Sequence, residues 1–135
     1  MSETERARIE ALVATIDAHP EPLHADYTAE VRALIAIGLP SLAAVLPLLM
    51  ADAELTRLRA QRVLEGVTRA WAGASGRDRE RRREWEALWL RHGDYDWRAP
   101  AMTRAASVRQ WQDWLAGIGA QSADGGGGAA GDQFT

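Results

Sequence analysis

Three residue types are missing from this 135-residue chain, and each absence removes a class of chemistry. Without cysteine there is no disulfide framework and no thiolate metal site. Without lysine no side chain can form a Schiff base, and a phosphate-binding loop that ends in lysine is excluded. Asparagine is also absent. All sixteen basic residues are therefore arginine, a bias that is typical of GC-rich coding sequences.

The chain also lacks a long apolar run. No stretch approaches the about 18 apolar residues of a membrane span, and residues 1–6 carry charges where a secretory signal would be apolar. The formal net charge of −3 gives no general attraction to nucleic acid. We therefore expect a soluble cytoplasmic protein whose apolar residues, 47% of the total, suffice for one domain core.

Apolar residues recur with a helical period along most of the chain, and no segment shows a sustained two-residue alternation of strand type. Ser2 and Glu5 form a capping box that should begin the first helix. Asp26 or Thr28 is expected to cap the second helix, and Gly38 to end it. These patterns predict an all-α fold.

The remaining helices are predicted from their prolines, caps and glycines. Pro40 suits the first turn of a third helix, whereas Pro47 lies inside that helix and should bend it. A fourth helix is expected from about residue 52 to 71, and a fifth, capped by Ser75 and Asp78, should stop at Gly93. With a sixth helix the chain would form three helix pairs, roughly 3–38, 40–72 and 77–118.

The middle pair combines a proline-containing first helix, an aspartate turn and an arginine- and alanine-rich second helix. The residues that carry this pattern are Pro47, Asp52, Arg57, Arg59, Ala60 and Leu64. The pair resembles a HEAT-like repeat of the bacterial type. Residues 30–38 look like the second helix of an earlier repeat, and residues 93–115 are similar to a segment that closes bacterial HEAT-repeat proteins. The resemblance implies a short right-handed solenoid of about three antiparallel helix pairs, a fold found in adaptors, lyase subunits and assembly factors alike.

Arginines on the second helices form the first candidate binding surface. In a HEAT-like stack these helices line the concave side, and helical steps of about 100° per residue bring the arginines onto neighbouring positions. The candidate residues are Arg32, Arg59, Arg62 and Arg69. Guanidinium groups bind carboxylates in a two-pronged fashion, so the expected partner is a protein with an acidic patch. The alternative is a solvated face whose arginines pair with Glu54 and Glu65.

Six tryptophans are the next notable feature. Trp85, Trp89 and Trp111 lie at helical spacings and are expected in the core. Trp97 and Trp114 are the candidates for the surface. An indole at the rim of a small domain is an effective anchor for a protein partner, so we add these two residues to the predicted partner-binding set.

No residue set demands a metal, a cofactor or a catalytic reaction. His19, His24 and Asp26 are close in sequence, but they flank two prolines and lack the spacing of metal ligands on one helix. The arginine-rich run 77–84 alternates with acidic residues at i, i+4 spacing, which favours a solvated helix over a nucleic-acid site. We therefore expect no enzyme activity, no metal and no cofactor.

The last segment, residues 121–135, has a different composition from residues 1–120. Its four consecutive glycines predict a flexible tail attached to one helical domain. Phe134 is the only phenylalanine, and with the terminal Thr135 it would suit a C-terminal recognition peptide that docks into a partner. The other interpretation is a precursor whose glycine-rich end is modified by an enzyme.

These observations together predict a non-enzymatic scaffold or adaptor that binds another protein, as an independent module or as an accessory subunit of a larger bacterial complex. Self-association is compatible with the same surface. The alternative function is the precursor or substrate protein with a modified tail.

Overall fold

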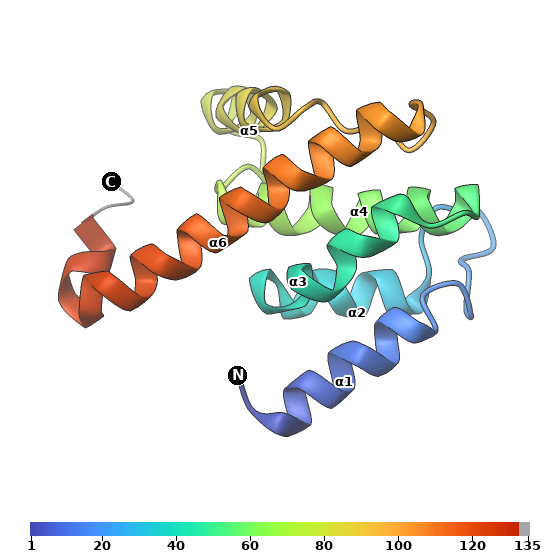
Figure 1. Cartoon of the computed structure of the whole chain (residues 1–135), viewed down its shortest axis with the longest axis horizontal. Helices are drawn as coiled ribbons and strands as arrows, with labels where there is room; N and C mark the ends of the chain where they lie inside the picture. Colours follow the sequence, from blue (N-terminus) through green and yellow to red (C-terminus); the bar gives the residue numbers. More distant parts are fainter. Residues whose placement is uncertain (133–135) are drawn as a thin grey trace.

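The computed structural model describes the backbone of residues 1–132 and the side chains of residues 1–121, and the described part is built from helices (Figure 1). Within residues 1–132 the one β-type pairing is an isolated bridge between Pro20 and Thr28. The helices are α1 (Glu3–Ala14), α2 (Ala29–Ile37), η1 (Leu39–Ser41), α3 (Leu42–Val45), η2 (Leu46–Met50), α4 (Glu54–Trp71), α5 (Arg79–Arg91) and α6 (Ala101–Asp132). The predicted all-α class is confirmed.

Local capping sets most helix boundaries. Ser2 accepts a hydrogen bond from the Glu5 N–H and begins α1, and Thr28, not Asp26, caps α2 by accepting from Val31. Asp78 begins α5 by accepting from two backbone N–H groups of the first turn. Each cap satisfies donors that a helix start leaves without a partner, so short sequence patterns fix these boundaries.

The segment between α2 and α4 is more broken than the single bent helix that was predicted. Gly38 ends α2 with a φ of 86°, a left-handed value that glycine adopts without a steric penalty. Pro40 and Pro47 then each lie near the start of a 3-10 helix. The four residues of α3 separate these two 3-10 helices. Proline lacks an N–H donor, and therefore the regular α-helical ladder cannot continue through either position.

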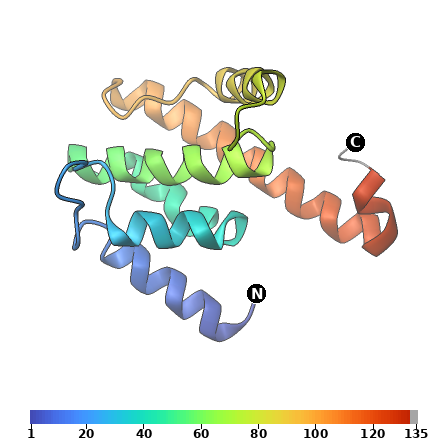
Figure 2. The ribbon, with the colours of Figure 1, turned by 180° about the vertical axis from the view of Figure 1, so that it is seen from behind.

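Helices α2 and α4 lie side by side and form the middle of the molecule (Figure 2). Helix α1 packs on α2 and α3, and α4 also packs on the segment η1–α3–η2. Gly66 permits the close approach of α2 to α4, because a Cβ atom there would lie 2.7 Å from Cδ1 of Ile35. The buried apolar side chains that fill the space between these helices include Val31, Leu34, Leu42, Val45, Leu46, Leu49, Val63 and Leu64.

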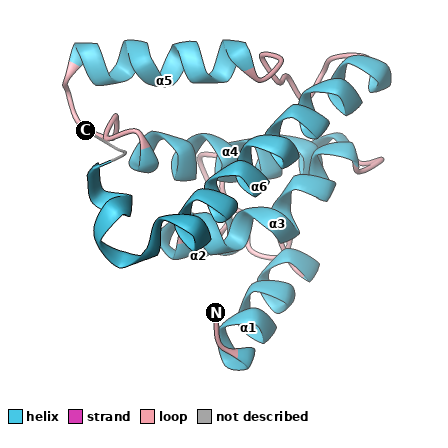
Figure 3. Cartoon of the chain, turned by 60° about the vertical axis from the view of Figure 1, so that its left-hand side comes forward, coloured by secondary structure: helices cyan, strands magenta, loops and turns pink. Residues whose placement is uncertain are grey.

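The third helix pair is placed differently from the first two. Helix α5 contacts α4 and lies along one edge of the molecule, whereas α6 runs diagonally in front of α4 and α3 in this view and packs on η2 and α3 (Figure 3). The expectation that α2, α4 and α6 would line one common surface is therefore wrong. Trp111 of α6 is fully buried, and its ring centroid lies 5.3 Å from that of Trp89 on α5 and 4.7 Å from that of His92.

The backbone of α6 continues to Asp132, beyond the body formed by the other helices (Figure 1). It thus enters the segment that was predicted to be a glycine-rich tail. Phe134 and Thr135, the predicted tail-recognition residues, lie outside the described residues. The division into a domain of residues 1–120 and a tail of residues 121–135 stays a prediction.

Among residues 1–132 no single helix has both the length and the apolar composition of a membrane span. One bent pair, α2 with the segment Leu39–Met50, meets the length and composition criteria, with an angle of 116° between its two parts.

Candidate functional site on helix α5

The four arginines that were predicted to bind a partner are all engaged within the chain. Arg59 is the most deeply placed, with 5% of its surface exposed. Its Nε donates to the carbonyl of Ala25 at 3.0 Å, and its guanidinium also donates to Asp17 at 2.9 Å. Arg59 therefore fastens the loop before α2 to the middle of α4.

Arg62 makes a similar connection one turn further along α4. Its Nε donates to the Asp26 carboxylate at 2.6 Å, and its Nη1 donates to the Glu65 carboxylate at 3.0 Å. The hydrogen bond from Arg62 lowers the pKa of Asp26 below the usual value of an aspartate. Glu65 was named as a partner in the alternative interpretation, and this contact agrees with it.

The other two arginines of the predicted row lie on the surface but face partners. Arg32 donates to both carboxylate oxygens of Glu21, at 2.8 and 3.2 Å, and lies over the ring of Tyr27. The hydrogen bond from Arg32 lowers the pKa of Glu21. Arg69 lies over the Trp85 ring at 4.4 Å from its centroid. Each of the four arginines thus contacts a different part of the chain, and the structure does not bring them together as one binding surface.

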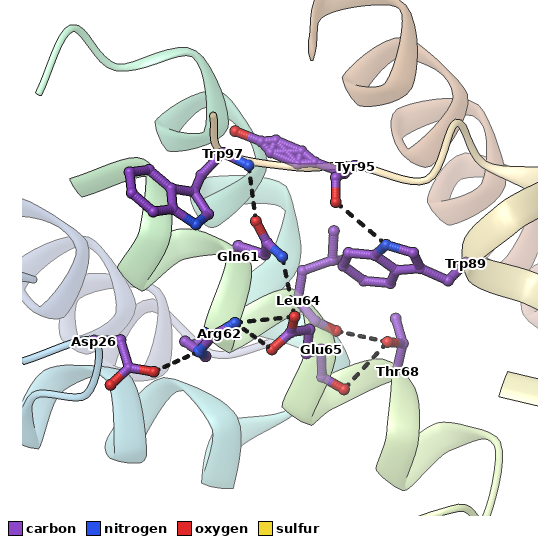
Figure 4. A network of polar contacts seen from close by, with 9 residues as sticks. All are labelled: Asp26, Gln61, Arg62, Leu64, Glu65, Thr68, Trp89, Tyr95 and Trp97. Carbon is purple, nitrogen blue, oxygen red and sulfur yellow. Dashed lines mark hydrogen bonds and ion pairs between the residues drawn. The ribbon is translucent and has the colours of Figure 1, made fainter. Parts of the chain in front are cut away.

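A chain of polar contacts extends from Arg62 across the molecule (Figure 4). Glu65 also accepts from Gln61 at 3.0 Å, and Gln61 accepts from the backbone N–H of Trp97 at 2.9 Å. The chain of contacts therefore joins the loop before α2, helix α4 and the connector between α5 and α6. Its role in the structure is to fix two loops on one central helix.

Trp97 and Trp114 are both half-buried. Trp97 is held at its backbone, where its carbonyl accepts from Arg57 at 3.0 Å. Trp114 packs edge-on against Trp111 and Trp71, with ring centroids 5.3 and 5.1 Å apart. Each retains some exposed ring surface, but they lie on different elements and do not share a site with the arginines.

Trp85, Trp89 and Trp111 are buried, as expected for core residues. The indole N–H of Trp85 donates to Thr68 at 2.8 Å. The indole N–H of Trp89 donates to the Tyr95 carbonyl at 3.3 Å (Figure 4). Both N–H groups therefore point into the protein, so whatever part of these rings reaches the surface is carbon.

A hollow of about 240 Å³ lies beside this tryptophan pair, between the outer side of α5 and the turn that ends it. Its lining residues are Trp85, Glu86, Trp89, Leu90 and Asp94. Leu90 is 63% exposed, and both carboxylates lie at the surface. Within the part of the chain that the structure describes, Glu86 and Asp94 make no side-chain hydrogen bond or ion pair.

The turn that carries Asp94 is held firmly. Gly93 has a φ of 89°, and a Cβ atom there would lie 2.8 Å from the Cβ of Ser107 on α6. Asp94 itself has a φ of 48°, a left-handed value that aspartate tolerates better than most residues, and its N–H donates to the Trp89 carbonyl at 3.0 Å. The hydroxyl of the next residue, Tyr95, donates a hydrogen bond to the backbone carbonyl of Leu49. Burial raises the pKa of Tyr95 to about 12.

Sequence reasoning did not identify this hollow. Glu86 and Leu90 are four residues apart on one helical face, which was visible, but nothing local showed that Asp94 would fold back beside them. The signal that was available is the glycine stop at Gly93, since a left-handed residue reverses the chain direction after a helix.

His19 and Asp26, whose sequence spacing argues against a metal site, make other contacts. Nδ1 of His19 lies 2.5 Å from Glu30, which also accepts from the His19 backbone N–H at 3.2 Å. Across the residues whose side chains are described, no group of three or more His, Asp and Glu side chains is arranged to hold a metal ion.

Comparison with known proteins gives no family for this chain: no family model, no curated protein and no solved structure matches it significantly.

Proposed function

We propose that this chain is a non-enzymatic, protein-binding helical module that acts as a scaffold or adaptor, with the exposed side of α5 as its contact surface. The observation that carries the proposal is the hollow on α5 with Leu90 at its rim. Leu90 is 63% exposed and lines the hollow together with two tryptophans and two carboxylates, and an apolar hollow with a polar rim is the anatomy of a protein–protein contact site.

The arrangement of the helices supports a relation to HEAT-like repeats over the first two pairs. The first helix of one pair, α1, packs on α3 of the next, and the second helices α2 and α4 pack on each other. Like elements of successive repeats are neighbours in a solenoid. The third pair reverses this order, since α5 neighbours α4 and α6 neighbours η2. We propose two HEAT-like pairs closed by a reversed third pair.

Site-specific photocrosslinking of the full-length chain tests the contact surface. A photoreactive amino acid at Leu90 should form a defined crosslink to a partner in cells that produce the protein. The matched control places the same amino acid at Leu23, which is 88% exposed but lies on the loop before α2, away from the hollow. A partner crosslinked at both positions with equal yield would contradict the proposal.

The substitution Leu90→Asp provides the second arm of this test. It should abolish co-purification of the crosslinked partner while the melting temperature stays nearly unchanged, because an exposed residue contributes little to stability. If the partner still co-purifies with this variant, α5 is not the contact surface. If the crosslinked species is a second copy of the chain, the protein self-associates through α5 and the adaptor role is refuted.

A further inference from the structure

The chemistry of the hollow on α5 is one-sided, because all of its side-chain polar groups are acceptors. Glu86 and Asp94 supply carboxylates, and Leu90 is apolar. The two tryptophans would be the only side-chain donors, but their N–H groups are already bonded to Thr68 and to the Tyr95 carbonyl inside the protein. A complementary ligand must therefore supply donors and positive charge.

The tryptophan rings favour a cation of a particular shape. The centroids of Trp85 and Trp89 lie 5.6 Å apart, and their planes are inclined by 40°. Arg69 already lies over Trp85 at 4.4 Å, so one guanidinium–indole contact of the relevant kind exists within the chain. A guanidinium group is planar, stacks on aromatic rings and bonds carboxylates with two parallel N–H groups, which an ammonium group cannot do.

We infer that this hollow binds an arginine side chain from a basic segment of a partner protein, with the guanidinium group between the Glu86 and Asp94 carboxylates and its aliphatic stem against Leu90. The inference rests on the proposed protein-binding function and specifies the partner's chemistry. The charge of the expected partner is opposite to that predicted from the arginine row, because those arginines are engaged within the chain.

The chain's own arginines limit how strong this binding can be. Arg82 lies one helical turn before Glu86 on the same row of α5, although no contact joins the two side chains in the structure. At this i, i+4 spacing its positive charge is expected to compete with an external arginine for the Glu86 carboxylate. Removal of this competitor by Arg82→Gln should therefore tighten the binding of an external arginine about twofold to threefold.

The direct test is an NMR titration of the full-length protein with a tri-arginine peptide blocked at both ends. The matched control peptide contains citrulline in place of arginine, which keeps the shape and removes the charge. We expect saturable shifts of the Trp85 and Trp89 indole signals and of the amides near Glu86 and Asp94, with millimolar affinity. We expect none of these shifts with the citrulline peptide. Equal shifts with both peptides, or shifts spread over the whole acidic surface, would overturn the inference.

A pair of charge variants makes the test specific for the site. The double variant Glu86→Gln and Asp94→Asn should weaken binding of the tri-arginine peptide about tenfold, because two exposed charge contacts are lost. Asparagine also tolerates the left-handed backbone at position 94. The control, Glu80→Gln with Glu84→Gln, makes the same change in net charge on the same helix and should weaken binding less than about twofold. Equal weakening in the two variants would mean that the attraction is unspecific.

The outcomes separate this inference from the proposed function. If Leu90 crosslinks a partner but the peptide does not bind at the hollow, α5 is a contact surface and the arginine inference is wrong. If the peptide binds as expected but no partner is crosslinked at Leu90, the hollow recognises arginine and the adaptor proposal is wrong.

Discussion

Helices α4 and α5 are both rich in arginine, yet most of the arginines of α4 occupy a different environment from those of α5. On α4, Arg57 and Arg59 are buried and bond backbone carbonyls of distant loops, and Arg62 bridges two carboxylates, whereas Arg69 is exposed. The arginines of α5 are all exposed, and among the described side chains only Arg81 has a charged partner, Glu84 on the same helix.

The difference shows that the surroundings, not the residue type, set the role of an arginine. On α4 the guanidinium groups replace missing backbone hydrogen bonds in the loops that pack against the helix, so they stabilise the fold. On α5 the helix rests on the body through Trp85, Leu88 and Trp89, and its other sides meet solvent. The proposed contact surface is therefore on α5 and not on α4.

The largest expected effect that separates the two helices is the loss of Arg59. Arg59→Ala removes the hydrogen bonds that this buried guanidinium group donates to the Ala25 carbonyl and to Asp17. We expect a loss of about 2–3 kcal/mol in the free energy of unfolding, measured by chemical denaturation. The matched variant Arg82→Ala on α5 should change it by less than about 0.5 kcal/mol. Similar losses in both variants would remove the distinction between the helices.

Glycine substitutions sharpen the same contrast between the centre and the periphery. Gly66→Ala on α4 forces Ile35 of α2 to move, and we expect a net loss of about 1 kcal/mol after the gain in helix propensity. Gly117→Ala on the outer part of α6 meets open space and should stabilise the protein by about 0.5–1 kcal/mol. Thermal melts measure the change in melting temperature for each variant, and the two changes must have opposite signs. Stabilisation by both substitutions would mean that α2 and α4 are not closely packed.

The smallest expected effect is a change in how the free energy of unfolding depends on pH in acid. Because the pKa of Asp26 is lowered in the folded state, its contact with Arg62 contributes stability above the usual aspartate pKa, near 4. That contribution is lost as the pH falls through the folded value. Asp26→Asn should therefore cost roughly 0.5 kcal/mol at pH 6, and the difference from the unmodified protein should vanish in acid. A difference that is constant down to the acid transition would contradict this assignment.

Helix boundaries were the most predictable part of the fold. Ser2, Thr28 and Asp78 act on donors two or three residues away, and Gly38 ends a helix through its own backbone conformation. Interactions of this range are contained in a short sequence window, so pattern reading identifies them. The burial of Trp85, Trp89 and Trp111 followed from helical spacing for the same reason.

The placement of the arginines was not predictable in the same way. Arg59 and its partner Asp17 are separated by 42 residues, and Arg62 and Asp26 by 36. Helical spacing correctly put both arginines beside the apolar stripe of α4, but it carries no information on which loop folds over that side. The hollow depends equally on the third helix pair, whose reversed position no local pattern shows.

Chemical modification of arginine tests the contrast between α4 and α5 most directly. Phenylglyoxal reacts with accessible guanidinium groups, and peptide mass spectrometry gives the rate for each residue. The account predicts that Arg79, Arg82 and Arg83 react fast in the native protein, whereas Arg57 and Arg59 react at least about tenfold more slowly and lose this protection in denaturant. Equal native-state rates for the two groups would contradict the claim that α4 holds Arg57 and Arg59 inside the protein while the arginines of α5 remain in solvent.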